Sequence, residues 1–174
     1  MTPHMSITLE QVNQASAEEA LALLDGLYEH SPWVAEKALA ARPFKSPAHL
    51  KYVMTRVLED AGREAQVRLI QAHPELAGKA MVSNTLTADS ANEQTRSGLT
   101  NCSPQDLATL QTLNADYNKK FGWPFIAAVK YLDRASIIKL FAERLELSAA
   151  DEFENCLANI EKITRWRLDD QVSA

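Results

Sequence analysis

The residues of this chain that are best suited to chemistry are an imidazole, a carboxylate and an amide, and they lie in two segments. His73 opens a His-Pro-Glu-Leu-Ala-Gly sequence at residues 73–78, and Glu93 and Gln94 follow downstream. Histidine is the side chain whose unperturbed pKa lies near neutrality, so an imidazole held against a carboxylate can transfer a proton at physiological pH. These residue types indicate acid–base chemistry.

The position of His73 follows from its neighbours. The preceding residues predict a helix over 63–72, and Pro74 disfavours helical geometry in the residue before it. We therefore expect His73 at a helix end, facing a cleft or solvent. The alternative is a polar helix-terminal histidine that makes one backbone hydrogen bond.

A second predicted helix, over residues 87–97, carries polar side chains on one face. Ser90, Glu93, Gln94 and Ser97 stand at positions i, i+3, i+4 and i+7. Such a face can bind a small polar ligand through directional hydrogen bonds. The alternative is a face that is simply solvated.

Residues 121–126 read Phe-Gly-Trp-Pro-Phe-Ile, an apolar run that Gly122 and Pro124 interrupt. If a helix begins near Pro124, the free N–H groups of its first turn can bind an anion or a carbonyl oxygen. The alternative is an apolar corner between two core helices.

Arg167 lies on the apolar side of a terminal helix, four residues after Ile163 and seven after Ile160. An inward-facing cation needs a partner. That partner is either an anionic substrate or an internal carboxylate.

The elements that must position these residues are all helical. Ser31-Pro32, Ser46-Pro47 and Ser103-Pro104 resemble helix starts, and Ser16 with Glu19 and Ser148 with Asp151 have capping-box spacing. Apolar residues recur at helical intervals, and no segment alternates as a strand does. We predict an all-α fold, a single-domain bundle of about eight helices spanning residues 1–174.

Composition excludes several classes of function. The net charge is −5 and no basic run exceeds a pair such as Lys119-Lys120, so we expect no nucleic-acid partner. No run approaches the roughly 20 apolar residues of a membrane span, and the first residues do not read as a signal peptide. We therefore expect no membrane association and a cytoplasmic location.

The sequence offers no ligand set for a metal or an organic cofactor. Cys102 and Cys156 match no metal-ligand spacing and are expected to be free thiols, and His4, His30 and His49 form no zinc pattern with His73. Glycine-rich phosphate loops and dinucleotide fingerprints are also missing from the sequence. We expect neither metal nor cofactor.

Taken in order, these segments resemble the 2-oxo-4-hydroxy-4-carboxy-5-ureidoimidazoline (OHCU) decarboxylases of urate degradation. The matching segments are Ser31-Pro32-Trp33-Val34, Arg42-Pro43-Phe44, residues 73–78, Ser90-x-x-Glu93-Gln94 with Gly98-Leu99, Asn114-x-x-Tyr117-x-x-Lys120-Phe121-Gly122-Trp123-Pro124-Phe125-Ile126, and Arg167-Leu168. The chain departs from the pattern at Trp123, where the family usually has phenylalanine, and at Thr95-Arg96-Ser97, which replaces a more alanine-rich stretch.

The resemblance implies an all-α, cofactor-independent homodimer that converts OHCU, a small anionic ureidoimidazoline, into (S)-allantoin and CO2. It implies that His73 supplies the catalytic imidazole, and we assign His73 as proton donor with Glu93 tuning it. The substrate-binding residues that it implies are Pro74, Ser90, Glu93, Gln94, Phe125, Ile126, Ala127 and Arg167.

Two other functions remain open at this point. One is a non-catalytic helical module that binds a purine-derived ligand or a partner protein through the same cleft. The other is a cofactor-free hydrolase in which His73 and Glu93 activate water.

Overall fold

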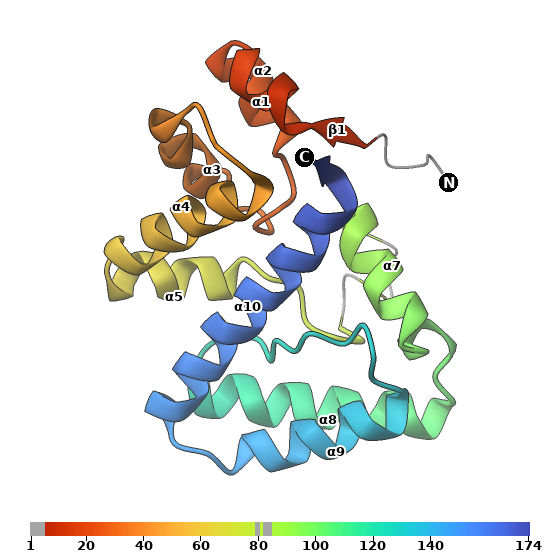
Figure 1. Ribbon diagram of the computed structural model, residues 1–174. Helices are drawn as coiled ribbons and strands as arrows, with labels where there is room; N and C mark the ends of the chain where they lie inside the picture. Colours follow the sequence, from red (N-terminus) through yellow and green to blue (C-terminus); the bar gives the residue numbers. More distant parts are fainter. Residues whose placement is uncertain (1–5, 79–80, 82–84) are drawn as a thin grey trace. The chain divides into compact units, whose positions relative to one another are not determined.

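The computed structural model describes residues 6–78, 81 and 85–174, and their regular elements are almost all helices (Figure 1). In order along the chain, the elements are β1 (Ile7–Thr8), α1 (Leu9–Gln14), α2 (Ala17–Leu23), α3 (Trp33–Ala38), the 3-10 helix η1 (Leu39–Ala41), α4 (Pro47–Asp60), α5 (Arg63–Gln71), α7 (Ala88–Arg96), the 3-10 helix η2 (Leu99–Asn101), α8 (Pro104–Phe121), α9 (Arg134–Leu145), α10 (Ala149–Gln171) and β2 (Val172–Ser173). The predicted all-α class is confirmed.

The chain divides into two compact units. The first contains Met1–Leu69 and Glu161–Ala174, and the second contains Ile70–Ile160. Trp33 and Trp166 belong to the first unit and Trp123 to the second. That the whole chain folds as a single domain stays a prediction.

Most of the predicted helix starts are confirmed by side-chain caps. Ser46 Oγ accepts from the N–H of His49 at the start of α4, and Ser103 Oγ accepts from Asp106 at the start of α8. Ser16 forms a complete capping box on α2. The start at Ser31-Pro32 is correct only in position, because the first turn of α3 has no side-chain cap.

In the first unit, consecutive helices pack against one another, with contacts between α1 and α2, between α2 and α3, and between α3 and α4. The buried face of α4 presents Leu50, Met54 and Leu58, which follow the predicted helical spacing. The expectation of no strands is wrong in one detail: β1 and β2 form a parallel pair in which Ile7 aligns with Val172. Two-residue strands are too short to show an alternating pattern in the sequence.

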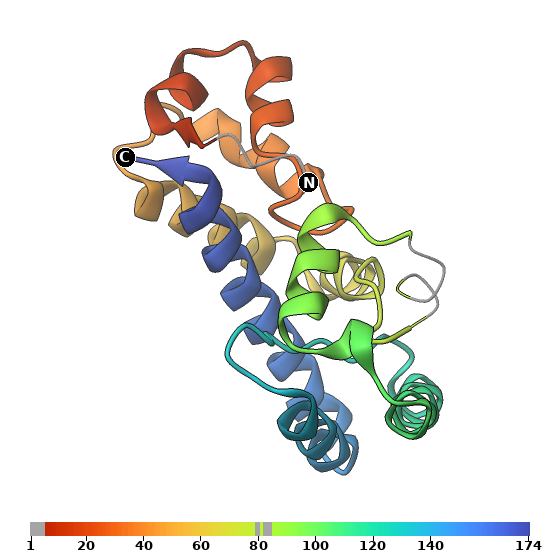
Figure 2. The same cartoon turned by 90° about the vertical axis from the view of Figure 1, so that its right-hand side faces the viewer.

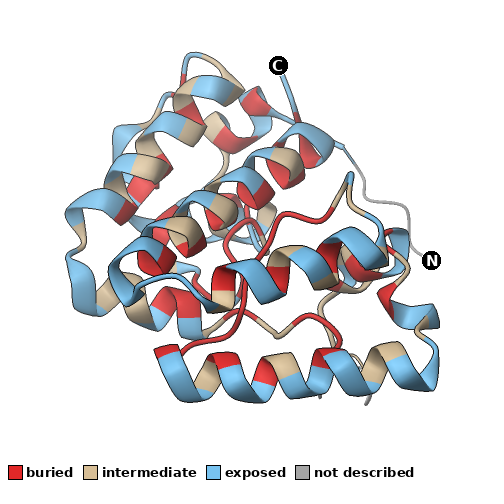
Figure 3. Ribbon diagram, turned by 90° about the horizontal axis from the view of Figure 1, so that it is seen from below, coloured by how far each residue is buried: buried red, intermediate tan, exposed pale blue. Residues whose placement is uncertain are grey.

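In the second unit, α8 and α9 lie side by side, as two views show (Figures 1 and 2). Residues 123–129 connect them without helix or strand, and every one of these residues is buried (Figure 3). An aromatic cluster surrounds this segment, with Phe125 stacked on Phe141 at 3.9 Å between ring centroids and Tyr117 edge-on to both. A core of packed rings therefore fixes the path of an irregular chain.

Among the helices of the described residues, none combines the length and the apolar character that crossing a membrane requires.

Candidate active site

The loop at residues 73–78, which carries the predicted catalytic imidazole, follows the last turn of α5. The N–H of His73 donates to the carbonyl oxygen of Ile70 at 3.1 Å, which closes the helix end. His73 is only 8% exposed. The predicted position at a helix end is confirmed, and burial excludes the solvent-facing alternative.

The polar face of α7 is a buried surface. Thr87 caps the helix, because its side chain accepts from the N–H of Ser90. Ser90, Gln94 and Ser97 are buried and Glu93 is half-buried. This burial excludes the alternative of a solvated face, since buried polar groups require hydrogen-bonding partners.

Gln94 joins α7 to the 73–78 loop through both ends of its side-chain amide. Its Oε1 accepts from the N–H of Ala77 at 2.9 Å, and its Nε2 donates to the carbonyl oxygen of Glu75 at 3.3 Å. Ala77 is fully buried and has a φ of +52°, which is unusual for a residue with a side chain. Two predicted site segments, the loop and the polar face of α7, are thereby brought together.

Two asparagines of α8 contact the same loop. Asn114 Nδ2 donates to the carbonyl oxygen of Leu76 at 2.9 Å. Asn118 Nδ2 donates to the carboxylate of Glu75 and to the carbonyl oxygen of Asn114. Asn114 has no role predicted from the sequence, and Asn118 is not among the predicted site residues. Their spacing of four residues on one helix face was the available signal.

One of the two alternatives for residues 121–126, a helix beginning near Pro124, is excluded. Gly122 ends α8 in the left-handed conformation, with a φ of 80°, and the next helix, α9, begins at Arg134. Pro124 lies in the buried, irregular 123–129 segment. The alternative, an apolar corner between two core helices, is confirmed. No first-turn N–H groups are therefore available at this position for an anion.

A buried ion pair, which no sequence pattern predicted, holds this segment. Arg144, on α9, donates from Nε to Glu152 Oε1 at 2.8 Å and from Nη1 to the carbonyl oxygen of Ile126 at 2.7 Å. Its guanidinium also lies over the Phe125 ring, 4.4 Å from the centroid. On the other side of the segment, the N–H of Ala128 donates to Asn159 Oδ1 at 3.0 Å.

Two further titratable groups, Tyr117 and Cys156, meet at this ion pair. Tyr117 donates its hydroxyl hydrogen to Glu152 and lies 3.3 Å from Cys156 Sγ, while Trp123 Nε1 donates to the Tyr117 hydroxyl at 3.2 Å. Burial raises the pKa of Tyr117 and of Cys156. Burial alone would also raise the pKa of Glu152, but hydrogen bonds from Arg144, Tyr117 and Asn155 outweigh it and hold this pKa below its ordinary value.

Arg167 belongs to the first unit. Its Nη1 donates to Glu29 Oε2 at 2.7 Å and to the carbonyl oxygen of Gly26 at 2.8 Å, and both charged side chains are buried. The predicted internal carboxylate partner is therefore present. A role for Arg167 in binding substrate beside His73 stays a prediction, as does the pairing of His73 with Glu93.

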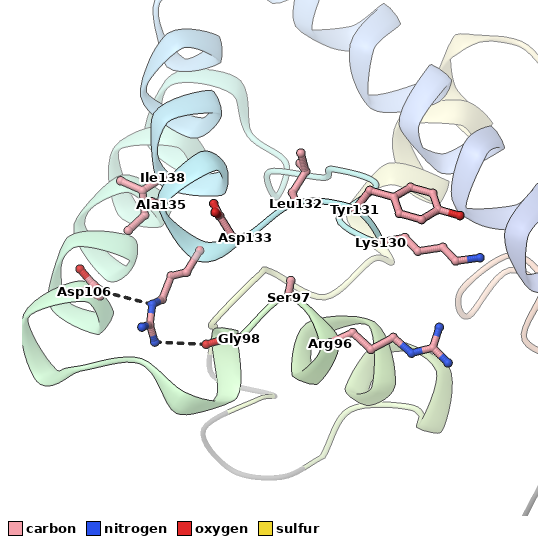
Figure 4. Close-up of a pocket in the computed structure, with 11 residues that line it drawn as sticks. Arg96, Ser97, Gly98, Asp106, Lys130, Tyr131, Leu132, Asp133, Ala135 and Ile138 are labelled. Carbon is pink, nitrogen blue, oxygen red and sulfur yellow. Dashed lines mark hydrogen bonds and ion pairs between the residues drawn. The ribbon is translucent and has the colours of Figure 1, made fainter.

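The second unit also contains a pocket of about 900 Å³ between the end of α7 and the start of α9 (Figure 4). Arg96 and Lys130 extend from opposite walls, and Arg134 is held by Asp106 and by the carbonyl oxygen of Gly98. His73 and Glu93 do not line this pocket. It shares only Ser97 with the predicted polar face of α7.

In the described part of the chain, no three His, Cys, Asp or Glu side chains are grouped so that they could hold a metal ion. His4 lies outside the described residues. Cys102 and Cys156 are free thiols, and Cys156 is buried.

Solved structures resemble this fold. A crystal structure of (S)-allantoin synthase superposes with a TM-score of 0.78 and 22% identity, covering 96% of this chain and 54% of that one. This chain thus spans about half of the chain in that structure. An OHCU decarboxylase crystallised in the presence of (S)-allantoin gives a TM-score of 0.63 and 20% identity, covering 80% of this chain and 94% of that one.

Sequence comparisons cover almost the whole chain. The sequence model of the OHCU decarboxylase family matches residues 13–169. A 2-oxo-4-hydroxy-4-carboxy-5-ureidoimidazoline decarboxylase of Haloferax volcanii is 36% identical over 168 residues, which are 97% of this chain and 98% of that protein. The match over residues 13–169 and the identity to this relative show that the chain belongs to the OHCU decarboxylase family.

Proposed function

We propose that this protein decarboxylates OHCU to (S)-allantoin and CO2 in urate degradation, with His73 as the proton donor. The observation that carries the proposal is the family match over residues 13–169. The hydrogen bonds between the 73–78 loop and Gln94 of α7 support it. They hold the loop that follows the buried His73 against the helix face that includes Glu93.

The substrate supplies the electron sink for this reaction. Its carboxylate and hydroxyl share one carbon, next to a ring C=N bond. When the bond to the carboxylate breaks and CO2 leaves, the electron pair forms a C=C bond to the neighbouring ring carbon, and the electrons of the C=N bond pass to its nitrogen, which takes up a proton. The enol-like intermediate then takes a proton on that neighbouring carbon, which bears the ureido group, while the hydroxyl on the carbon that lost CO2 gives up its proton and becomes a carbonyl. The reaction therefore needs a proton donor on one face and no electron-accepting cofactor.

His73 delivers that proton in this proposal, and Glu93 orients and tunes the imidazole. Positioned acid–base catalysis of this kind is worth about 10²–10⁴ in rate. Because His73 is buried, its proton reaches the substrate on one face without competition from bulk water. Delivery to a single face is what yields one enantiomer.

The remaining residues bind and orient the substrate. Pro74 provides an apolar wall against the flat ring, and Ser90 and Gln94 offer hydrogen bonds to carbonyl and ureido groups. The Ile126 carbonyl oxygen accepts from Arg144 and the Ile126 N–H bonds to Cys156. We therefore assign the substrate contacts of this segment, Phe125, Ile126 and Ala127, chiefly to the N–H groups of Phe125 and Ala127. Arg167 counters the charge of the substrate.

The decisive experiment mixes the protein with freshly generated OHCU and follows optical activity and CO2 release together. We expect an optically active product that forms faster than in buffer. Racemic allantoin formed at the buffer rate would contradict the proposal. Ligand binding without product would instead support a non-catalytic binding module, and a ring-opened product without CO2 would support a hydrolase.

We further propose that the protein works as a homodimer in the cytoplasm. The family membership supports a dimer, and the free thiols Cys102 and Cys156 suit a reducing compartment. Sedimentation equilibrium at micromolar concentration should give twice the chain mass of 19.3 kDa. A monomer under these conditions would contradict the dimer.

A further inference from the structure

We propose that Asn114 and Asn118 of α8 are positioning residues for the proposed decarboxylation, on which this inference rests. Their side-chain amides hold residues 75 and 76, just beyond His73, and so keep the imidazole in place. Neither residue is proposed to contact the substrate.

The 73–78 loop depends on side chains for its hydrogen bonds. Apart from a local turn at Leu76 and Ala77, the backbone of residues 74–78 bonds to side chains in the described part of the chain. Its partners are Gln94, which binds Glu75 and Ala77, and Asn114, which binds Leu76. Three consecutive residues are therefore held by two amide side chains from two helices. Removing one of these amides releases part of the loop without unfolding either helix.

The conformation of the loop requires such support. Ala77 has a φ of +52°, a region that alanine seldom occupies, and such a conformation persists only where its surroundings hold it. The bond from Asn114 to Leu76 and the bond from Ala77 to Gln94 lie on either side of the Leu76–Ala77 peptide. Together they determine the direction in which the chain leaves His73-Pro74.

The environment of Asn114 indicates that its side-chain N–H group, which binds the loop, explains why asparagine occupies this buried position. The residue is 4% exposed, and its Oδ1 is buried without a hydrogen-bond partner in the described part of the chain. An unsatisfied buried acceptor destabilises a protein, so leucine of similar size would suit this position better if packing alone mattered. The bond that Nδ2 donates to Leu76 gives asparagine a role here that leucine cannot fill.

Asn118 acts on the same loop through Glu75. A Cβ atom on Gly78 would lie 2.6 Å from Glu75 Cβ and 2.9 Å from Glu75 Oε2, so the Glu75 side chain folds back against Gly78. Asn118 Nδ2 donates to the other carboxylate oxygen, Oε1. The Glu75 carboxylate is thus fixed between the loop backbone and α8, and it links the two.

The first test compares Asn114→Ala with Gln111→Ala, which removes an exposed amide from the same helix. We expect Asn114→Ala to lower kcat about tenfold to a hundredfold, as small displacements of a catalytic group do, with KM changed less than about threefold. Gln111→Ala should match the wild type. An Asn114→Ala protein with wild-type kcat would overturn the proposal.

The second test is Asn118→Asp, which places a second carboxylate against Glu75. Two adjacent carboxylates share a proton at low pH and repel one another when both are ionised. The kcat of Asn118→Asp relative to the wild type should therefore be lowest near neutral pH and should recover as the pH falls towards about 5. A pH-independent ratio would count against the proposal, since general loss of packing does not depend on pH in this way.

Nuclear magnetic resonance of the His73 ring separates this inference from the proposed function. The ring carbon and nitrogen shifts should change in Asn114→Ala and Asn118→Asp but not in Gln111→Ala, whether or not the protein turns over OHCU. Unchanged shifts in both loop variants would overturn the positioning role. Changed shifts in a protein that does not accelerate decarboxylation would contradict the proposed function alone.

Discussion

The guanidinium of Arg144 donates to the carbonyl oxygen of Ile126 at 2.7 Å while the same side chain forms a buried ion pair with Glu152. One side chain of α9 thus neutralises the buried Glu152 carboxylate and also holds the irregular segment assigned to the substrate site. Stability and site geometry are coupled through this arginine.

Replacing Arg144 with methionine should destabilise the protein by about 3–5 kcal/mol, because Glu152 would be left buried without its counter-charge. Arg68→Met is the matched control, since Arg68 pairs with Glu64 in solvent and its loss should change the free energy of unfolding by less than about 0.5 kcal/mol. Urea denaturation of the two variants measures both values. Equal free energies of unfolding would contradict the role of the buried pair.

Low pH should weaken the same ion pair. The folded-state pKa of Glu152 lies below its ordinary value of 4.5, so its contribution to stability is present at neutral pH and is lost as the pH falls through the folded value. The difference in free energy of unfolding between the wild type and Glu152→Gln should therefore be largest near pH 7 and shrink below about pH 4.5. A difference that stays constant down to about pH 3 would argue against the depressed pKa.

Trp123→Phe should cost about 0.5–1.5 kcal/mol of stability, because phenylalanine cannot replace the bond from Nε1 to the Tyr117 hydroxyl. Decarboxylase activity should be retained, since phenylalanine is the usual family residue at this position. A double-mutant cycle with Tyr117→Phe, followed by urea denaturation, isolates the interaction. A coupling energy of zero would mean that the hydrogen bond adds nothing to stability.

His73→Asn should remove the acceleration of OHCU decarboxylation, a loss of about 10²–10⁴ in rate. His30→Asn provides the control: His30 is exposed and has a φ of 50°, a conformation that asparagine tolerates well. Stopped-flow detection of optical activity follows both variants. Wild-type rates in His73→Asn would exclude the imidazole as proton donor.

Arg167→Gln should mainly weaken substrate binding, because one charge-assisted hydrogen bond is worth about 1.5–3 kcal/mol, which corresponds to a rise in KM of about tenfold to a hundredfold. The exposed neighbour Arg165 gives the control variant, Arg165→Gln. Thermal unfolding of Arg167→Gln separately measures the lost pairing with Glu29. An unchanged KM with lowered stability would assign Arg167 a structural role only.

Local features of the structure were predictable from the sequence. Ser46, Ser103 and Ser16 cap helices as their neighbours indicated, because capping depends on residues within three positions of the cap. The polar face of α7 was identified from spacing alone. Ser31 shows the limit of this reasoning, because a Ser-Pro pair marks a helix start without requiring that serine caps it.

Long-range features were not predictable. Glu152 and Arg144 lie on different helices, and no pattern within either helix indicates that they pair. Pro124 could begin a helix or follow an irregular path, and the packing of Phe125 against Phe141 decides between them. A polar stripe such as that of α7 is by default a solvated face, and its burial depends on the residues that pack against it, which its own spacing does not show.

The placement of the three tryptophans offers an optical probe of folding. Trp33 and Trp166 report on the first unit and Trp123 on the second. The fluorescence of a variant that keeps only Trp123 would report the unfolding of the second unit. The fluorescence of a variant that keeps only Trp33 and Trp166 would report the unfolding of the first unit. Coincident curves would establish all-or-none cooperativity across the chain, and separate curves would give each half its own melting point.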